Sequence, residues 1–376
     1  MATPTTSTVA GGQTPAISHR RRQVGRAAVA AWAIALTAFC LYDGFPFDRA
    51  YQSLWILSGL AAASIARPWR HVARIFADWV PFIAILYLYD YSRGAADLLG
   101  ATVQVEGPIM WDRALFLGAD PTVWLQQTFY DPRAVHWWDK IGALVYTSHF
   151  FVVWVIAAVL YHRDREHWFR WARAVVVLSF AGLATYALMP SAPPWYASRE
   201  GLLPPLHRIS TRGLDSLGLS FADGLIDQGR AVANDVAAIP SLHTAFAVLV
   251  SVWFFNRVPR RHRWWLQPLL AVYPIAMLTV LVYSGEHYVV DGLIGSVYVV
   301  AVLAGLALWD RRRTAAVALP AADGPAVGSA ATDRPAEGSA ATDGPAEGSA
   351  ATDRQAVGSA AASAQPAAAE GDLAPS

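Results

Sequence analysis

Long apolar runs separated by short polar stretches dominate the chain as far as Trp309. A membrane-spanning helix needs about 20 predominantly apolar residues, and eight runs reach that length or come close to it with their flanks. They lie at 27–43, 50–66, 75–90, 141–161, 170–189, 242–257, 265–284 and 291–309. Asp78 and Pro81 interrupt the third run, so Asp78 must lie near an interface or face the bundle. The pattern predicts an all-α, polytopic membrane helix bundle with about eight transmembrane helices, occupying residues 27–313.

The composition supports a membrane protein. Of the 376 residues, 55% are hydrophobic and 15% are charged, which is too apolar for an ordinary soluble domain. The formal net charge of +1 lacks the excess of positive charge that is typical of nucleic-acid-binding proteins, so nucleic acid is not an expected partner. The single cysteine, Cys40, excludes a disulfide within the chain and a cysteine-ligated metal site. No feature of the pattern points to a particular oligomeric state.

The arginines orient the predicted bundle. They cluster at 20–26, 67–74, 163–173, 257–263 and 311–313. With eight crossings every cluster falls on one side, which the positive-inside rule makes the cytoplasm. We therefore expect a multi-pass protein of the cell membrane with both termini in the cytoplasm. The long segments 91–140 and 190–240 would then be extracytoplasmic.

Both ends of the chain are expected to be disordered. Residues 1–26 are Thr/Ala/Gly-rich and then basic, and residues 314–376 include four ten-residue repeats rich in Ala, Gly, Pro and Ser. Such segments cannot bury enough apolar surface to offset the entropy of ordering the chain. The predicted domains are therefore a disordered cytoplasmic start, the membrane domain and a disordered tail.

Two histidine motifs carry the candidate chemistry: Pro-Ser-Leu-His-Thr at 240–244 and Ser-Gly-Glu-His-Tyr-Val-Val-Asp at 284–291. Ser241 is a good N-cap, which places His243 in a first helical turn where the helix dipole favours an anion. The spacing of four puts His287 and Asp291 on one face of a helical turn, where the carboxylate can orient the ring. Together these features favour phosphoryl chemistry; the alternative is that they are interfacial polar residues that end spans.

These motifs resemble the second and third signature motifs of the type 2 phosphatidic acid phosphatase superfamily. The resemblance covers roughly residues 105–310 and implies a six-helix phosphatase-like core. It also implies that His287 is the nucleophile, Asp291 its orienting partner and His243 the proton-transfer group.

Two features of the phosphatase branch are missing from the sequence. Val280-Leu281 replaces its usual Ser-Arg pair, and its K-x6-R-P motif is absent from the region 187–195. With Leu242 where glycine is usual, these absences resemble the inositol phosphorylceramide synthase-like (inositolphosphotransferase) branch.

The resemblance therefore implies an integral membrane enzyme that needs no cofactor. It would cleave a lipid phosphoester through a phosphohistidine and pass the phosphoryl-bearing headgroup to an alcohol or to water. A lipid phosphate or polyprenyl (di)phosphate phosphatase is the alternative reaction. Two further alternatives are a zinc site made by the two histidines and Asp291, and a transporter. The transporter lacks support, because the second half of the sequence does not repeat the first and no pair of broken helices is indicated.

Further residues are assigned to substrate binding. Because Val280-Leu281 cannot bind phosphate, we expect one or more arginines of the 190–240 segment to do so through their planar guanidinium groups. The candidates are Arg199, Arg208, Arg212 and Arg230, of which Arg199 is preferred and Arg230 is the second assignment. Ser241, at the start of the predicted helix, is also assigned to substrate binding. The alternative for each arginine is a solvated loop charge.

Two residues of the fourth run complete the predicted pocket. Tyr146 and His149 lie one turn apart, and an intramembrane histidine usually faces a cavity. A hydrogen bond between helices is the alternative. In the 91–140 segment, Asp120-Pro121 predicts a helix start, and the tryptophans nearby favour short helices in the headgroup region or an ordinary aromatic belt.

The predicted topology can be tested by labelling. In a Cys40→Ala background, a cysteine introduced in the 190–240 segment should react with an impermeant thiol reagent on intact cells. One introduced between Arg257 and Arg263 should react only after permeabilisation. The reverse pattern would contradict an extracytoplasmic active site.

Overall fold

Helices make up nearly all of the regular structure. The computed structural model describes residues 19–42, 49–95, 99–219 and 234–318. The α-helices of these residues are α1 (His19–Tyr42), α2 (Arg49–Ser64), α3 (Trp69–Gly94), α4 (Glu106–Leu115), α5 (Pro121–Phe129), α6 (Trp137–Arg163), α7 (Arg165–Leu188), α8 (Pro194–Arg199), α10 (Leu242–Phe255), α11 (Arg263–Tyr283) and α12 (Val289–Ala318). Two 3₁₀ turns, η2 (Asp215–Leu217) and η3 (Arg260–His262), accompany them. The described part of the chain contains two isolated β-bridges and no strand.

The eight predicted runs correspond to α1, α2, α3, α6, α7, α10, α11 and α12. The polytopic helical bundle is therefore confirmed. Among the described residues, six helices are long and apolar enough to cross a membrane, and α2 and α10 are not among them. The number eight is thus not confirmed. Helix α10 has only 14 residues because it begins after the Ser241 cap and ends at Phe255.

Two helices extend into segments for which disorder was predicted. Helix α1 begins at His19, and α12 continues to Ala318. Both extensions are basic or Ala-rich and continue an apolar helix, so propagation costs little once the helix has formed. Residues 1–18 and the repeat tail from residue 319 lie outside the described residues.

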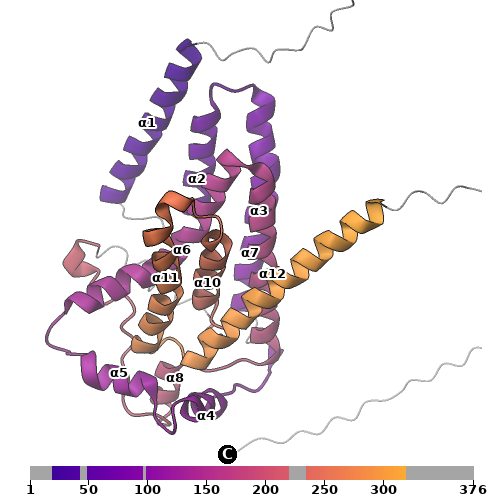
Figure 1. Ribbon diagram of the computed structural model, residues 1–376. Helices are drawn as coiled ribbons and strands as arrows, with labels where there is room; N and C mark the ends of the chain where they lie inside the picture. Colours follow the sequence, from indigo (N-terminus) through magenta and orange to yellow (C-terminus); the bar gives the residue numbers. More distant parts are fainter. Residues whose placement is uncertain (1–18, 43–48, 96–98, 220–233, 319–376) are drawn as a thin grey trace, which may run out of the picture. The chain divides into compact units, whose positions relative to one another are not determined.

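The main core is formed by α3, α6, α7, α10 and α12 (Figure 1). Trp79, Trp168 and Trp171 are each at most 1% exposed there. Asp78 faces this bundle, as expected for a charge within an apolar run. Its carboxylate accepts two hydrogen bonds of 2.6 Å from Arg165 and one of 2.8 Å from Tyr161. Pro81 lies inside α3 without ending the helix.

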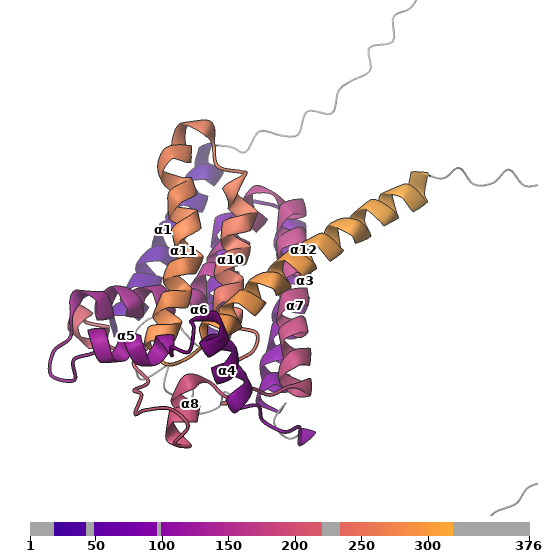
Figure 2. The same cartoon turned by 60° about the horizontal axis from the view of Figure 1, so that its bottom comes forward.

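Three short helices, α4, α5 and α8, gather at one end of the bundle (Figures 1 and 2). The predicted helix start is confirmed, because Asp120 is the N-cap of α5 and Pro121 its first residue. Two parallel bridges join Gln104 to Ser191 and Ser191 to Ala237. The segment that leads into α8 is therefore held between the segments that precede α4 and α10.

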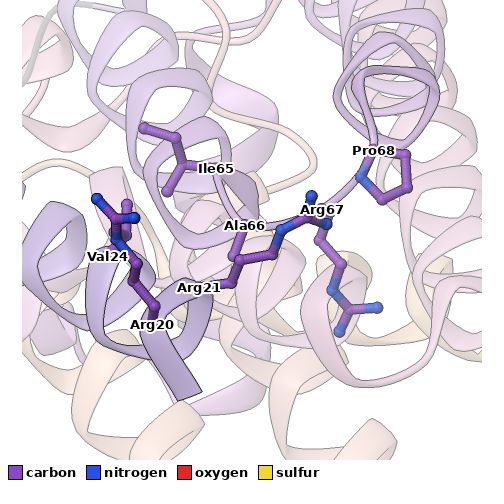
Figure 3. Close-up of a pocket in the computed structure, with 7 residues that line it drawn as sticks. All are labelled: Arg20, Arg21, Val24, Ile65, Ala66, Arg67 and Pro68. Atoms are coloured by element: carbon purple, nitrogen blue, oxygen red, sulfur yellow. The ribbon is translucent and has the colours of Figure 1, made fainter. Parts of the chain in front are cut away.

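A cationic cavity of about 440 Å³ lies between the start of α1 and the turn joining α2 to α3. Figure 3 shows the three arginines that line it, Arg20, Arg21 and Arg67. These residues belong to two of the predicted cytoplasmic clusters. The elements that line this cavity contribute none of the predicted site residues.

Helices α10 and α12 approach each other very closely at their first turns. The Ser241 N–H donates to the Asp291 carbonyl oxygen at 3.0 Å. Gly295 makes this possible, because a Cβ there would lie 2.6 Å from the Ser241 carbonyl oxygen. The two histidine motifs are joined at this contact.

We expect Gly295→Ala to push α12 away from α10, because backbone atoms cannot yield as a flexible side chain can. The free energy of unfolding should fall by about 1–3 kcal/mol, the usual cost of overpacking. Turnover should fall with it. Gly305→Ala is the control, since nothing lies within 4 Å of a Cβ at that position of the same helix. A Gly295→Ala protein with normal stability and turnover would contradict the close contact.

Candidate active site

Ser241 caps α10 as predicted. Its Oγ accepts the Thr244 N–H at 3.4 Å, and the residue is fully buried. His243 is therefore in the first turn of α10. In this position the ring lies beside the positive end of the helix dipole, which favours a bound anion.

His287 and Asp291 form the predicted pair, but not on one helical turn. Their Nδ1 and Oδ2 atoms are 3.2 Å apart. Helix α12 begins at Val289, so His287 lies in the turn before it. The helix starts late because the same Asp291 oxygen accepts the Tyr288 N–H at 2.9 Å and so acts as part of the N-terminal cap.

The pairing decides which ring nitrogen is available for chemistry. An ionised carboxylate can only accept hydrogen bonds, so Asp291 selects the tautomer with the proton on Nδ1 of His287. The lone pair then resides on Nε2. His287 is 6% exposed and Asp291 is fully buried, which strengthens this electrostatic interaction.

Two more predicted residues join the cluster from α6. The ring centroids of His149 and His243 are 4.0 Å apart, and Tyr146 stacks on His243 at 5.3 Å. The rings of His243 and His287 are 5.7 Å apart. No hydrogen-bond partner is found among the described residues for the buried His243 Nε2 and His149 Nδ1 atoms. Two helices, α6 and α10, and the turn before α12 thus bring four aromatic polar rings together.

The predicted arginines have different surroundings. The Arg199 side chain is 55% exposed, pairs with Glu200 and lies over the rings of Tyr196 and Trp195. Arg230 lies outside the described residues.

Two further arginines, Arg208 from the predicted 190–240 set and Arg93 from α3, interact with a histidine of the site. Arg208 and Arg93 both act electrostatically on His243. Arg208 shares the Trp195 ring with Arg199 and donates to Glu286, the neighbour of His287, at 2.9 Å. Arg93 lies in the last turn of α3 and interacts electrostatically with Tyr89 of the same helix.

The turn before α12 is held by side chains that the sequence analysis did not single out. Gln126 of α5 donates to the carbonyl oxygens of His207 and Tyr283 at 2.8 and 2.9 Å. It also accepts the His207 N–H at 2.9 Å. Gly285 has a φ of +74°, which favours glycine, and its carbonyl oxygen accepts the Trp195 N–H at 3.1 Å.

The missed residues share one signal, which is a polar side chain within an otherwise apolar or tightly turning stretch. They are Arg93, Asp112, Gln126 and Glu286. Their partners lie far away in the sequence, so spacing alone gives no indication of the contacts.

The positions of the missing Ser-Arg pair belong to the core. Leu281 is fully buried, and Val280 packs against Gly142 of α6. An apolar cavity of about 260 Å³ opens beside them, between α5, α6 and α11. It is lined by Leu125, Phe129, Trp137, Trp138, Gly142, Thr279, Val280 and Tyr283. An alkyl chain fits such surroundings better than a phosphate group does.

The described residues contain no group of three or more His, Cys, Asp or Glu side chains placed to hold a metal ion. What they do contain is an imidazole paired with a carboxylate and a second imidazole facing it at a capped helix start. This constellation can perform nucleophilic and acid–base steps on one phosphoryl group. Fold and site together define a multi-pass helical membrane protein with a His–Asp pair opposed by a second histidine.

Comparisons with known proteins agree with this class. The sequence profile of the PAP2 superfamily matches residues 109–318, more than half of the chain. The chain therefore belongs to the PAP2 superfamily. A phosphoinositol dihydroceramide synthase of Bacteroides thetaiotaomicron is 29% identical over 225 residues, which cover 57% of this chain and 71% of that protein. No solved structure matches the chain.

The family and this relative show that the expected relationship is correct. The protein is related to the inositol phosphorylceramide synthase-like members of the superfamily. It is a membrane enzyme that processes a lipid phosphoester, as a phosphotransferase or a phosphatase.

We expect Gln126→Ala to loosen the turn that carries His287. The substitution leaves three backbone groups without partners, and a buried unsatisfied group costs about 1–3 kcal/mol. Both the melting temperature and turnover should fall. Gln127→Ala, at an exposed position of the same helix, should change neither. If the two variants behave alike, Gln126 does not support the site.

Proposed function

We propose that the protein transfers a phosphoryl-bearing headgroup from a lipid donor to an alcohol acceptor through a covalent intermediate on His287. The observation that carries this proposal is the His287–Asp291 pair, 3.2 Å between Nδ1 and Oδ2, with the His243 ring 5.7 Å from that of His287. One phosphoryl group can lie between the two imidazoles.

In the first step, Nε2 of His287 attacks phosphorus while the bond between phosphorus and the lipid oxygen breaks. A protonated His243 gives its proton to that leaving oxygen. Asp291 stabilises the positive charge that develops on the His287 ring. The lipid alcohol departs, and the headgroup phosphoryl remains on His287.

In the second step, the acceptor hydroxyl attacks phosphorus and the N–P bond breaks. His243, now neutral, takes the hydroxyl proton and so returns to its starting state. No other reactant is needed, because the proton and the phosphoryl group are both balanced over the two steps.

Positive charge for the phosphoryl oxygens comes from the start of α10 and from arginine. Arg208 and Arg93 are our preferred cations, because both act electrostatically on His243. Arg208 is also held in place by its hydrogen bond to Glu286. Arg199 also lies over the Trp195 ring, and it is a further candidate cation at the edge of the site. Tyr146 and His149 would line the acceptor side.

Burial favours an alcohol over water as the acceptor. His287 and Asp291 are at most 6% exposed, and the segment from residue 283 to residue 290 contacts side chains or backbone of α4, α5 and α8. The name of the Bacteroides relative suggests that the acceptor belongs to the class of long-chain lipid alcohols. The site would lie on the extracytoplasmic side, opposite the arginine clusters.

The assay that tests the reaction uses lipid extracts with and without an added lipid alcohol. Headgroup exchange onto the alcohol supports a transferase, and phosphate or headgroup release that ignores the alcohol supports a phosphatase. Neither product, with accumulation of an unaltered lipid across the membrane, would instead support a transporter.

Substitutions should separate the roles of the two histidines. His287→Ala should abolish turnover with every leaving group, because no covalent intermediate can form. Asp291→Asn should slow turnover by about 10²–10⁴-fold, since the ring remains but loses its anionic partner. His243→Ala should still react with an activated phenol ester, whose leaving group needs no proton, and should then accumulate the adduct.

Mass spectrometry of the peptide containing His287, at neutral or alkaline pH, measures this adduct. We expect it to be strongest in His243→Ala and absent in His287→Ala. His262→Ala is the control, because His262 belongs to η3, between α10 and α11 and outside both motifs. Equal losses in both active-site variants with no adduct would contradict covalent catalysis.

A further inference from the structure

Asp112 of α4 caps a helix to which it does not belong. Its carboxylate accepts the Val289 N–H at 3.0 Å and the Val290 N–H at 2.9 Å. These are the first two residues of α12, and they lie 177 and 178 positions away in the sequence. The first N–H groups of a helix have no partner within the helix, so a cap usually comes from the residue just before it.

The two donors continue the cap made by Asp291. Tyr288 donates to Asp291 Oδ2, the oxygen that lies 3.2 Å from His287 Nδ1. Three successive N–H groups, at 288, 289 and 290, are thus bound by two buried carboxylates. Any rotation or fraying of this first turn would move the Asp291 oxygen relative to the His287 ring.

We propose that Asp112 is a positioning residue, which fixes the first turn of α12 and thereby holds Asp291 and His287 in the geometry for attack on phosphorus. This inference rests on the proposed function, because it assumes that His287 is the nucleophile. Asp112 does not itself touch the reacting atoms.

The energetics favour a functional reason for a carboxylate at this position. Asp112 is 1% exposed, and burial raises its pKa to about 6, although the two backbone hydrogen bonds oppose this rise. The negative charges of Asp291 and Asp120 raise the pKa further. Tyr288 also faces this group, and Arg113 is paired with Asp120 at 2.8 Å.

The sign of the effect on stability follows from the raised pKa. A carboxyl whose pKa is higher in the folded than in the unfolded state contributes most to stability below the unfolded value, near 4. That contribution is lost as the pH rises through about 6. At neutral pH Asp112 is therefore charged, although its neutral form would stabilise the fold more. The charged carboxylate carries no proton, so both of its oxygens are free to accept the N–H groups of Val289 and Val290.

Asp112→Asn tests the proposal in the full-length protein, because an amide has the same shape but offers only one acceptor oxygen. We expect kcat to fall by about 10–100-fold while KM for the lipid stays within about twofold, since substrate contacts are unchanged. The acid limb of the wild-type pH profile, with an apparent pKa near 6, should disappear. Asp112→Glu keeps the charge and should retain that limb and recover part of kcat.

Asp120→Asn is the matched control. It breaks the ion pair with Arg113 on the same segment, and Asp120 makes none of the hydrogen bonds to α12. Its kcat should be close to that of the wild type. Removal of this nearby negative charge should move the acid limb to slightly lower pH. If Asp112→Asn does not fold, the shift of the acid limb in Asp120→Asn still tests whether Asp112 is the group that titrates.

The outcomes separate this inference from the proposed function. Adduct formation on His287 is measured first in His243→Ala with the activated phenol ester, and a missing adduct there would overturn the proposed function. If the adduct forms, an unchanged kcat in Asp112→Asn overturns the positioning role. So does an acid limb that neither Asp112→Asn nor Asp120→Asn alters. A loss of kcat that is matched by an equal loss of folded protein, with the limb intact, also overturns it.

Discussion

The close contact between the first turns of α10 and α12 determines where the chemistry can occur. The Ser241 N–H binds the Asp291 carbonyl oxygen at 3.0 Å, and Gly295 leaves room for that approach. Two motifs separated by more than forty positions thereby share one site. Because side-chain reach is short, a shift of about 1 Å here would separate the proposed nucleophile from its proposed acid–base partner.

The short helices at this end of the bundle support the reacting groups. Helix α12 supplies Asp291, but Asp112 of α4 completes its cap, and Gln126 of α5 holds the preceding turn. A polar group buried without partners is costly, so these long-range hydrogen bonds also select one conformation of the turn. The membrane helices thus provide the scaffold and the reacting groups, and the connecting segments fix their geometry.

Sequence patterns predicted the features that depend on neighbours in the chain. The apolar runs, the Ser241 cap and the Asp120-Pro121 helix start are local and were confirmed. The position of His287 before α12, rather than on it, was not predicted, because the late helix start depends on two carboxylates. The pairing of Arg208 with Glu286 likewise joins distant segments, so hydrophobic periodicity carries no information about it.

The stereochemistry at phosphorus tests covalent transfer most directly. Each in-line displacement inverts phosphorus, so two successive displacements through His287 restore the original configuration. A donor lipid with an isotopically chiral phosphodiester would be converted with an alcohol acceptor, and the product configuration would be determined. Net retention is the predicted result. Net inversion would show a single displacement and would contradict a phosphohistidine intermediate.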